Sequence, residues 1–404
     1  MTELAGLFFN PLQDGYGPDP YPHFAEMRDG DPIHLSLLDQ WVLFRYDDVS
    51  RLLRDPTLSV EDDNIEVRNQ ERLATVLDAY ADQEPVRSML GLDDPDHARL
   101  RRLVSKAFTP SAIAGLRPMI ERRVTDALDA MEERGTAEVV GELAWPLPFD
   151  VISEMLGLPE ADTEQIAKWS AAIVKTIDPI ITDEEIYAAA AAGKSMRSLL
   201  AEIIEWKRAN PADDILSALI EAEEDGDRLT PKELRAQVQL LFIAGHETTV
   251  NLIGTGIYEL LRNPEQAEEL RDDPTLDVAA VDELLRHVSP VQFSRRITLS
   301  DIEFDGITIP AGMSVLAGLA SSNHDPRKWG DDADRLDLRR PGAGQHLAFG
   351  SGSHYCLGAS LAKLEAQVAI PGFIRRFPNA AVVGEPEWNG RINLRGLERL
   401  HVTL

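Results

Sequence analysis

The cysteine at position 356 is the only one in the 404-residue chain, and its thiol is the first candidate for chemistry. A single cysteine cannot close an internal disulfide, so it is either a buried inert thiol or a reactive thiolate. Gly350, Gly352 and Gly358 lie around it, and glycines let a flat ligand approach the backbone closely. The helix expected from Leu357 onward would direct N–H groups at the sulfur and lower the pKa of the thiol. Cys356 is therefore a candidate axial ligand for a haem iron.

A second group of reactive side chains falls in a long helix expected over residues 231–263. The apolar run 240–244 predicts that this helix passes through the interior of the protein. Glu247 and Thr248 follow that run, and buried polar groups destabilise a fold unless they are paired or used. The Thr248 hydroxyl can donate to the carbonyl of Ala244, which either satisfies the threonine within the helix or bends the helix beside a ligand. We expect Glu247 to act as a proton donor there.

The dipeptide His246-Glu247 is also the start of a zinc-peptidase motif. That motif needs another histidine four residues after the first, on the same face of the helix. Val250 occupies that position, so the sequence excludes a metallopeptidase site of this type.

Glu283 and Arg286 form a third candidate pair, near the end of a helix that Ser289-Pro290 terminates. A spacing of three residues puts the carboxylate and the guanidinium on one face of the helix. Most such pairs are exposed and stabilise a protein by only a few tenths of a kcal/mol, so this pair gains meaning only from its context.

The elements that carry these residues are expected to be mainly helices. Over residues 97–290 apolar residues recur at three- and four-residue spacing, which predicts an almost continuous series of helices. Residues 57–90 show little periodicity and are expected to be mainly loop. We expect one mainly α domain over residues 1–404 with a small β portion: an N-terminal β and loop part (1–95), the helical part, and a cysteine-loop and C-terminal part (291–404).

The composition argues against several classes of function. A net charge of −29 disfavours nucleic-acid binding, which needs clustered cations. The first residues lack the basic start of a signal peptide, and no segment approaches the ~20 apolar residues that cross a bilayer, so we expect neither secretion nor a membrane anchor. With one cysteine and no targeting signal, we expect a cytoplasmic protein.

Taken together, the three constellations resemble the cytochrome P450 family. The cysteine segment matches the family signature at Phe349, Gly350, Gly352, His354, Cys356 and Gly358. The resemblance covers the chain from about Asp19 to the C-terminus, and the length and the lack of an anchor are similar to the soluble bacterial members. It implies the cytochrome P450 fold and heme b (iron protoporphyrin IX) as the cofactor.

The resemblance implies a haem-thiolate monooxygenase that activates dioxygen and hydroxylates or epoxidises a hydrophobic small molecule. Around the iron it assigns Cys356 as the axial ligand, Phe349 and Gly358 in the loop, Glu247 and Thr248 for proton delivery, and Ala244 and Gly245 along the oxygen groove. For the haem propionates it assigns His97, Arg101, Arg296 and His354.

Two further sets of residues follow from the resemblance. Arg335 would join Glu283 and Arg286 in a buried network that fixes the loop before the cysteine. The substrate pocket is expected to be mainly apolar. Its candidates are Phe242, Ala244, Val291, Phe293, Ile392 and Leu394, with parts of residues 60–90 and 179–181.

The source of electrons is expected to be a separate protein. The Gly-x-Gly pairs of the sequence lack the third glycine and the strand–turn–helix context of a dinucleotide site. We therefore expect a ferredoxin-type donor, docked on a basic surface of Arg99, Arg102, Lys106 and Lys363. We also expect the protein to be a monomer. Two alternatives stay open: a peroxide-driven peroxygenase of the same fold, and a non-catalytic haem-binding or recruitment domain.

Overall fold

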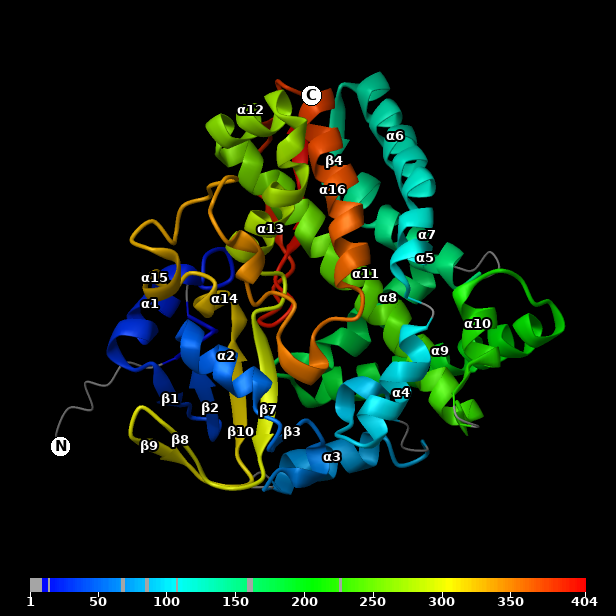
Figure 1. The fold of residues 1–404 in the computed structure, drawn as a ribbon, viewed down its shortest axis with the longest axis vertical. Helices are drawn as coiled ribbons and strands as arrows, with labels where there is room; N and C mark the ends of the chain where they lie inside the picture. The colour runs from blue at the N-terminus through cyan, green and yellow to red at the C-terminus, as the bar shows by residue number, and fades with distance from the viewer. Residues whose placement is uncertain are drawn as a thin grey trace.

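The structure is a computed structural model that describes residues 9–13, 15–66, 70–83, 87–106, 108–157, 163–224 and 227–404. Helices dominate it and the largest sheet lies at one side (Figure 1), so the mainly α architecture expected from the sequence is present. Among the described residues, none of the helices combines the length and the apolar character that a membrane span requires.

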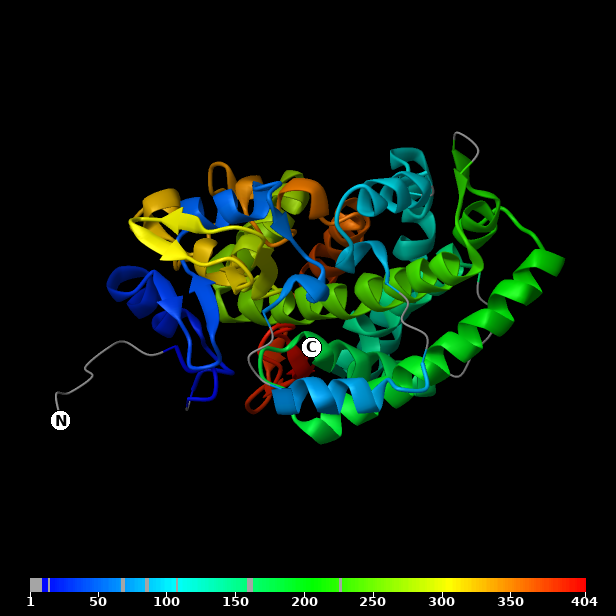
Figure 2. The same ribbon diagram turned by 90° about the horizontal axis from the view of Figure 1, so that it is seen from below.

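Helix α11 (Pro231–Arg262) is the axis of the fold and passes through the middle of the molecule (Figures 1 and 2). A capping box starts it: Thr230 Oγ1 accepts a hydrogen bond from the Glu233 N–H at 3.2 Å, and the Glu233 carboxylate accepts one from the Thr230 N–H at 2.8 Å. The helices packed against it include α7 (Pro146–Met155), α9 (Asp183–Ala209) and α16 (Ala359–Arg376). Leu241 and Phe242 of the apolar run therefore lie in the interior, as the sequence predicts, while Ala244 at its end is exposed.

The other helices surround this centre. They are α1 (Tyr21–Gly30), α2 (Tyr46–Arg54), α3 (Gln70–Ala79), α4 (Asp96–Ser105), α5 (Pro110–Gly115), α6 (Arg117–Arg134), α8 (Thr163–Val174), α10 (Ile215–Glu221), α12 (Pro264–Asp272), α13 (Asp277–Val288), α14 (Leu319–Ser322) and α15 (Pro326–Trp329). Shorter 3-10 or π segments lie at Asp62–Asn64, Met89–Gly91, Val140–Ala144, Lys175–Ile177, Pro274–Leu276, Ala343–Gln345 and Gly352–His354.

The structure departs from the sequence-based expectation in the stretch before α4. The sequence predicts mainly loop over residues 57–90, yet α3 forms there, and that part of the prediction is wrong. α3 packs on α9, where the Tyr187 hydroxyl donates to Asp78 Oδ2 at 2.6 Å. Tertiary contacts therefore stabilise a helix whose own apolar periodicity is weak.

Among the described residues the largest sheet has five strands in the order β1–β2–β10–β7–β3, and it lies beside the helices. Its strands are β1 (Ile33–Leu35), β2 (Gln40–Leu43), β10 (Ser314–Gly318), β7 (Phe293–Thr298) and β3 (Leu58–Ser59). β10 is parallel to β2 and antiparallel to β7, with Val315 opposite Arg296. The sheet thereby fixes the position of Arg296 within the fold.

The remaining strands form small sheets. They are β4 (Thr136–Glu138), β11 (Ala381–Val382) and β14 (His401–Thr403) in one sheet, and the pairs β5 (Glu223–Glu224) with β6 (Asp227–Arg228), β8 (Ile302–Phe304) with β9 (Ile307–Ile309), and β12 (Glu387–Trp388) with β13 (Leu397–Arg399). β14 lies between β11 and β4. The last strand of the chain is thereby paired with β4, which lies in the helical part of the sequence.

Candidate functional site

The middle of α11 has an open face, although most of the helix is buried. Ala244 is exposed, and Gly245 and Thr248 are half-buried. The Thr248 hydroxyl donates to the Ala244 carbonyl at 3.0 Å, as the sequence predicts. The oxygen of Thr248 can therefore accept a hydrogen bond from a group on the open side.

The opposite side of α11 belongs to the core. Phe242 is 1% exposed and meets the ring of Phe149 edge-on, with ring centroids 5.5 Å apart. It points about 160° away from Ala244 around the helix, so the prediction that Phe242 lines the substrate pocket is wrong. His246 shares this side, with its ring 5.0 Å from that of Trp145 and 5.7 Å from that of Phe149. Burial lowers the pKa of its imidazole to about 4.

Glu247 has a partner that the sequence analysis missed. Arg391 Nη1 donates to Glu247 Oε2 at 2.7 Å, and the two side chains are 14% and 12% exposed. The residues are 144 positions apart, so no spacing pattern links them. The only signal in the sequence was the expectation that the neighbouring segment Ile392–Leu394 lies near the pocket.

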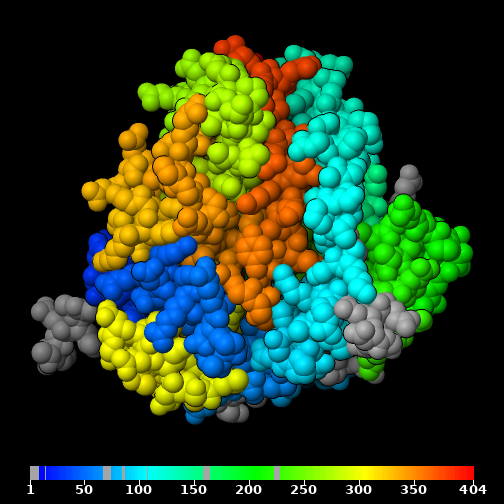
Figure 3. Space-filling view, viewed as in Figure 1, coloured from blue at the N-terminus to red at the C-terminus, as the bar shows by residue number. Residues whose placement is uncertain are grey.

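Cys356 lies in a loop that packs against the end of α2. Its N–H donates to the Phe349 carbonyl at 3.0 Å, and the Gly358 N–H donates to its sulfur. Gly352 has a φ of +76°, and a Cβ there would lie 2.5 Å from the carbonyl oxygen of Leu53, so only glycine allows this approach. The loop and the start of α16 (orange) reach the surface between α2 (blue) and α4 (cyan) in Figure 3.

The thiol of Cys356 is not acidified by the protein alone. Burial raises its pKa, and the Gly358 N–H and Arg101 lower it by less. The prediction that the following helix lowers this pKa is therefore wrong as a net effect, because desolvation of the thiolate outweighs a helix that starts only at Ala359. A metal ion at the sulfur would supply the positive charge that deprotonates a coordinating thiol.

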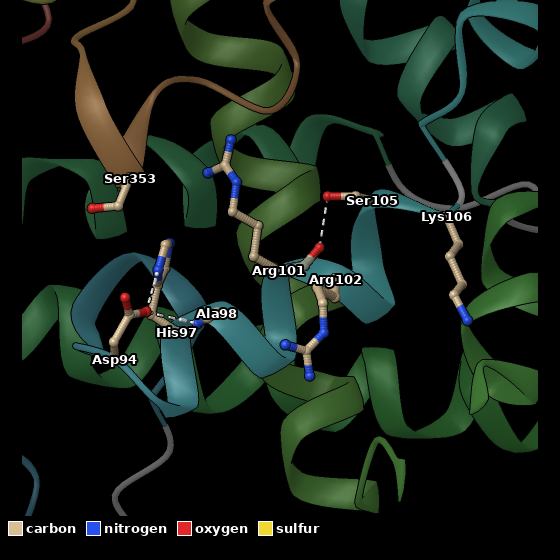
Figure 4. A pocket seen from close by; sticks show the side chains of 8 residues that line it. All are labelled: Asp94, His97, Ala98, Arg101, Arg102, Ser105, Lys106 and Ser353. Carbon is tan, nitrogen blue, oxygen red and sulfur yellow. Dashed lines mark hydrogen bonds and ion pairs between the residues drawn. The ribbon is translucent and has the colours of Figure 1, made fainter. Parts of the chain in front are cut away.

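A cavity of about 610 Å³ opens between α4 and the cysteine loop. Its lining residues are Asp94, His97, Ala98, Arg101, Arg102, Ser105, Lys106 and Ser353. Figure 4 shows Ser353 approaching the opening from the loop, while the other side chains come from the turn before α4, from α4 itself and from Lys106 directly after it. Arg101 Nη2 donates to the Tyr355 carbonyl at 2.6 Å and so ties α4 to the loop.

One edge of this region gathers positive charge and unused donors. The rings of His97 and His354 are 4.1 Å apart. Burial, followed by the charges of His97, Arg296 and Arg101, lowers the pKa of His354 to about 4. Burial likewise lowers the pKa of Arg296 to about 10. Nε2 of His97 is buried and has no hydrogen-bond partner among the described residues. Such a cluster suits a ligand that brings negative charge.

The Glu283–Arg286 pair is a buried network and not a surface pair. Both side chains are 0% exposed, and two guanidinium nitrogens donate to the carboxylate at 2.8 Å each. Arg340 Nε donates to Glu283 Oε1 at 3.1 Å. The side chain of Arg335 is exposed, and only its carbonyl takes part, accepting from Arg286 and Arg340 at 3.0 Å each. The prediction that the Arg335 side chain joins the pair is wrong, because the loop turns Arg340 inward instead.

Comparison with known proteins identifies the family of this site. The family model for Cytochrome P450 matches residues 75–387. The chain belongs to the cytochrome P450 family. It is 40% identical to Cytochrome P450 107B1 of Saccharopolyspora erythraea, with 97% of this chain and 96% of that protein covered. It is also 40% identical to the Vitamin D(3) 25-hydroxylase of Pseudonocardia autotrophica, with 96% and 94% covered.

The fold of this cytochrome P450 agrees with solved structures of the family. The Cytochrome P450 PksS of the Bacillus subtilis 168 bacillaene polyketide synthase superposes with a TM-score of 0.87 at 35% identity, with 98% of this chain and 100% of that chain covered. The cytochrome P450 fold predicted from the sequence is therefore confirmed. The protein is a cytochrome P450 monooxygenase, an oxidoreductase, and heme b is its cofactor.

The residues of this P450 fit heme b. Cys356 is half-buried, and its sulfur is of the type that serves as an axial ligand to haem iron. Ala244 and Gly245 expose little more than backbone on the open face of α11. The orphaned Nε2 of His97 and the buried Arg296 match the carboxylates that the propionates would bring.

The residues predicted for the P450 substrate pocket fall in two groups. Val291 and Leu394 pair through a β-bridge, which joins the segment before β7 to the C-terminal turn. Phe293 and Ile392 belong instead to an aromatic core cluster, where Phe293 lies 5.7 Å from Phe9 between ring centroids. Residues 67–69 and 84–86 of the predicted pocket stretch 60–90 lie outside the described residues.

Proposed function

We propose that this P450 binds heme b through the thiolate of Cys356 and uses dioxygen to oxygenate a hydrophobic small molecule. The overall reaction would be RH + O2 + 2 e− + 2 H+ → ROH + H2O, or the epoxide with the same balance. The carrying observation is the single, half-buried thiol in a loop whose close approach to α2 requires glycine at position 352, with positively charged side chains at one edge. The iron bound by this sulfur supplies the oxygen chemistry.

The protein's own residues would bind the cofactor and move protons. His97, Arg101, Arg296 and His354 would hold the propionates. Phe349 would keep the cysteine loop in shape, since its carbonyl accepts the Cys356 N–H. Ala244 and Gly245 would leave room for dioxygen on the open face of α11. Thr248, with its oxygen free to accept, and Glu247 beside it would pass the two protons that the reaction consumes.

The substrate is proposed to be a bulky apolar molecule of the steroid or polyketide type. Val291 and Leu394, two of the residues predicted for the pocket, are apolar and lie side by side in a β-bridge. The names of the relatives point the same way, since one acts on vitamin D(3) and another belongs to a polyketide synthase. Titration of the ferric protein with vitamin D(3) should convert the haem from low to high spin if it enters this pocket.

The remaining parts of the proposal concern partners and organisation. We propose that residues 1–404 act as one haem domain, as a monomer, with electrons from a separate ferredoxin. The absence of a dinucleotide fingerprint in the sequence supports an external donor. The cytoplasmic location stays a prediction of the sequence.

The spectrum of the reduced, CO-bound protein tests the proposed ligand. The wild type should show the red-shifted Soret band of thiolate haem, and Cys356→Ser should lose that shift. Gel filtration of the variant shows whether it still folds. A wild-type Soret band without the shift would contradict the proposal and would favour a haem bound by another residue.

A further inference from the structure

The carboxylate of Glu247 is held by a cation from a distant segment. Arg391 lies in the C-terminal turn, residues 389–394, and reaches the middle of α11 to donate to Glu247 Oε2 at 2.7 Å. The imidazole of His246 interacts electrostatically with both Glu247 and Arg391. It is buried on the core side of α11. Both side chains of this ion pair are largely buried, so neither charged group can reach water unless the pair separates. The pair therefore holds the two side chains in one relative position.

The turn that carries Arg391 is docked on α11 through its backbone. Asn389 Oδ1 accepts the Arg391 N–H at 3.1 Å, and Asn389 Nδ2 donates to the Leu394 carbonyl at 2.9 Å. One helical turn after Glu247, Asn251 Nδ2 donates to the Leu394 carbonyl at 3.4 Å and so joins the turn to α11. The fold therefore fixes the backbone from which the Arg391 side chain reaches Glu247.

The same turn is joined to the connection between α8 and α9. The Asn393 N–H donates to Asp178 Oδ1 at 2.7 Å, and its Nδ2 donates to the Ile177 carbonyl at 3.1 Å. Lys175 pairs with Asp178 at 3.2 Å. Residues 179–181, which we predict to lie beside the substrate, directly follow Asp178, so we expect a molecule in the pocket to act on the turn and on Arg391 through these contacts.

We infer that Arg391 is a positioning residue for Glu247. It holds the carboxylate on the side of the C-terminal turn, so that Glu247 takes a proton from solvent there and passes it to Thr248. The adjacent Thr248 has an acceptor oxygen on the open face because its own hydrogen is donated to Ala244. The inference rests on the proposed function, since protons are consumed only when dioxygen is the oxidant. With peroxide the balance is RH + H2O2 → ROH + H2O, and no proton is taken up.

Comparing the two oxidants therefore tests the inference. Styrene is the probe, oxidised either with dioxygen and a ferredoxin–reductase pair or with hydrogen peroxide. Arg391→Gln should lower the dioxygen-driven rate about tenfold, a part of what proton-transfer groups contribute, and leave the peroxide-driven rate within about twofold. Arg391→Lys, which keeps the charge, should recover most of the loss. Arg399→Gln is the matched control, because Arg399 lies in the same C-terminal region but pairs with Glu387 at the surface.

A double variant and a measurement without turnover complete the test. If Arg391 acts through Glu247, Arg391→Gln should add nothing in a Glu247→Gln background. Hydrogen exchange in residues 389–394 should rise in Arg391→Gln but not in Arg391→Lys or Arg399→Gln. Equal losses with both oxidants, or additive losses in the double variant, would overturn the inference and leave Arg391 a structural residue. A wild type that oxidises styrene only with peroxide would instead overturn the proposed function, and the inference with it.

Discussion

At the level of single residues, His246 gives the protein a specific response to pH. Burial lowers the pKa of its imidazole from 6.5 to about 4, so between these values the unfolded chain binds a proton that the folded protein does not. The free energy of unfolding therefore falls as the pH falls. From pH 7.5 to pH 5 this residue should account for a loss of about 2 kcal/mol. His246→Gln should remove that part, as measured by urea unfolding across the pH range.

The same experiment contains its own control. Above pH 7.5 the imidazole is neutral in both states, so the difference between wild type and variant should be constant there. That constant difference reports the packing lost against Trp145 and Phe149. If the free energy of unfolding of the variant fell with pH as steeply as that of the wild type, the imidazole would be protonated in the folded protein. That result would contradict its burial between Trp145 and Phe149.

Residues with local signals were predictable, and their distant partners were not. Cys356 and Thr248 stand out because the glycines and the helix pattern around them are contiguous in the sequence. Arg391 reaches Glu247 across 144 residues, and nothing in the local sequence distinguishes it from other arginines. The sequence predicts Arg335 as the partner of Glu283 and Arg286, but Arg340 has that role in the structure. Only the path of the backbone decides which of the two side chains the loop turns inward.

At the level of elements, the network on α13 clamps the loop that leads to the cysteine. Glu283 accepts from Arg286, from Arg340 and from the Asp337 N–H at 3.0 Å. Arg340→Gln should lower the free energy of unfolding by about 2–3 kcal/mol, because it leaves charged and backbone groups without partners in the interior. Urea unfolding of the ferric protein measures this loss.

The exposed Arg335 provides the matched control for that prediction. Arg335→Gln keeps the carbonyl that accepts from Arg286 and Arg340, so it should change the free energy of unfolding by less than about 0.5 kcal/mol. A reversed order of the two variants would mean that the Arg335 side chain, and not Arg340, completes the network.

Helices that begin with a capping motif were easier to predict than helices that depend on tertiary packing. The starts of α9 and α11 each carry a capping box that is visible in the sequence and present in the structure. The helical stretch after Thr109 divides into α5 and α6 at Leu116, because Pro118 lacks the N–H that would continue one helix. α3 has no such local signal and depends on α9, which the sequence alone cannot place beside it.

At the level of the whole molecule, the overall charge opposes the proposed electron donor. A net charge of −29 repels an acidic ferredoxin, while salt screens the repulsion beyond about 8–10 Å. A local basic surface must therefore guide docking. Arg102 on α4 and Lys106 directly after it are exposed beside the cysteine loop, whereas Lys363 on α16 is half-buried. The exposed cations at this end of α4 are thus the stronger candidates for the contact.

Reversing one of these charges tests the docking surface. Arg102→Glu should lower the rate of reduction by a ferredoxin about tenfold at low ionic strength and flatten its salt dependence, because the local attraction that orients the encounter is lost. Stopped-flow reduction of the CO-saturated protein measures both. Arg399→Glu makes the same change in net charge on exposed β13 and should alter the rate by less than about twofold. Equal effects of the two variants would show that the donor responds to the net charge alone, and α4 would no longer be assigned as its docking surface.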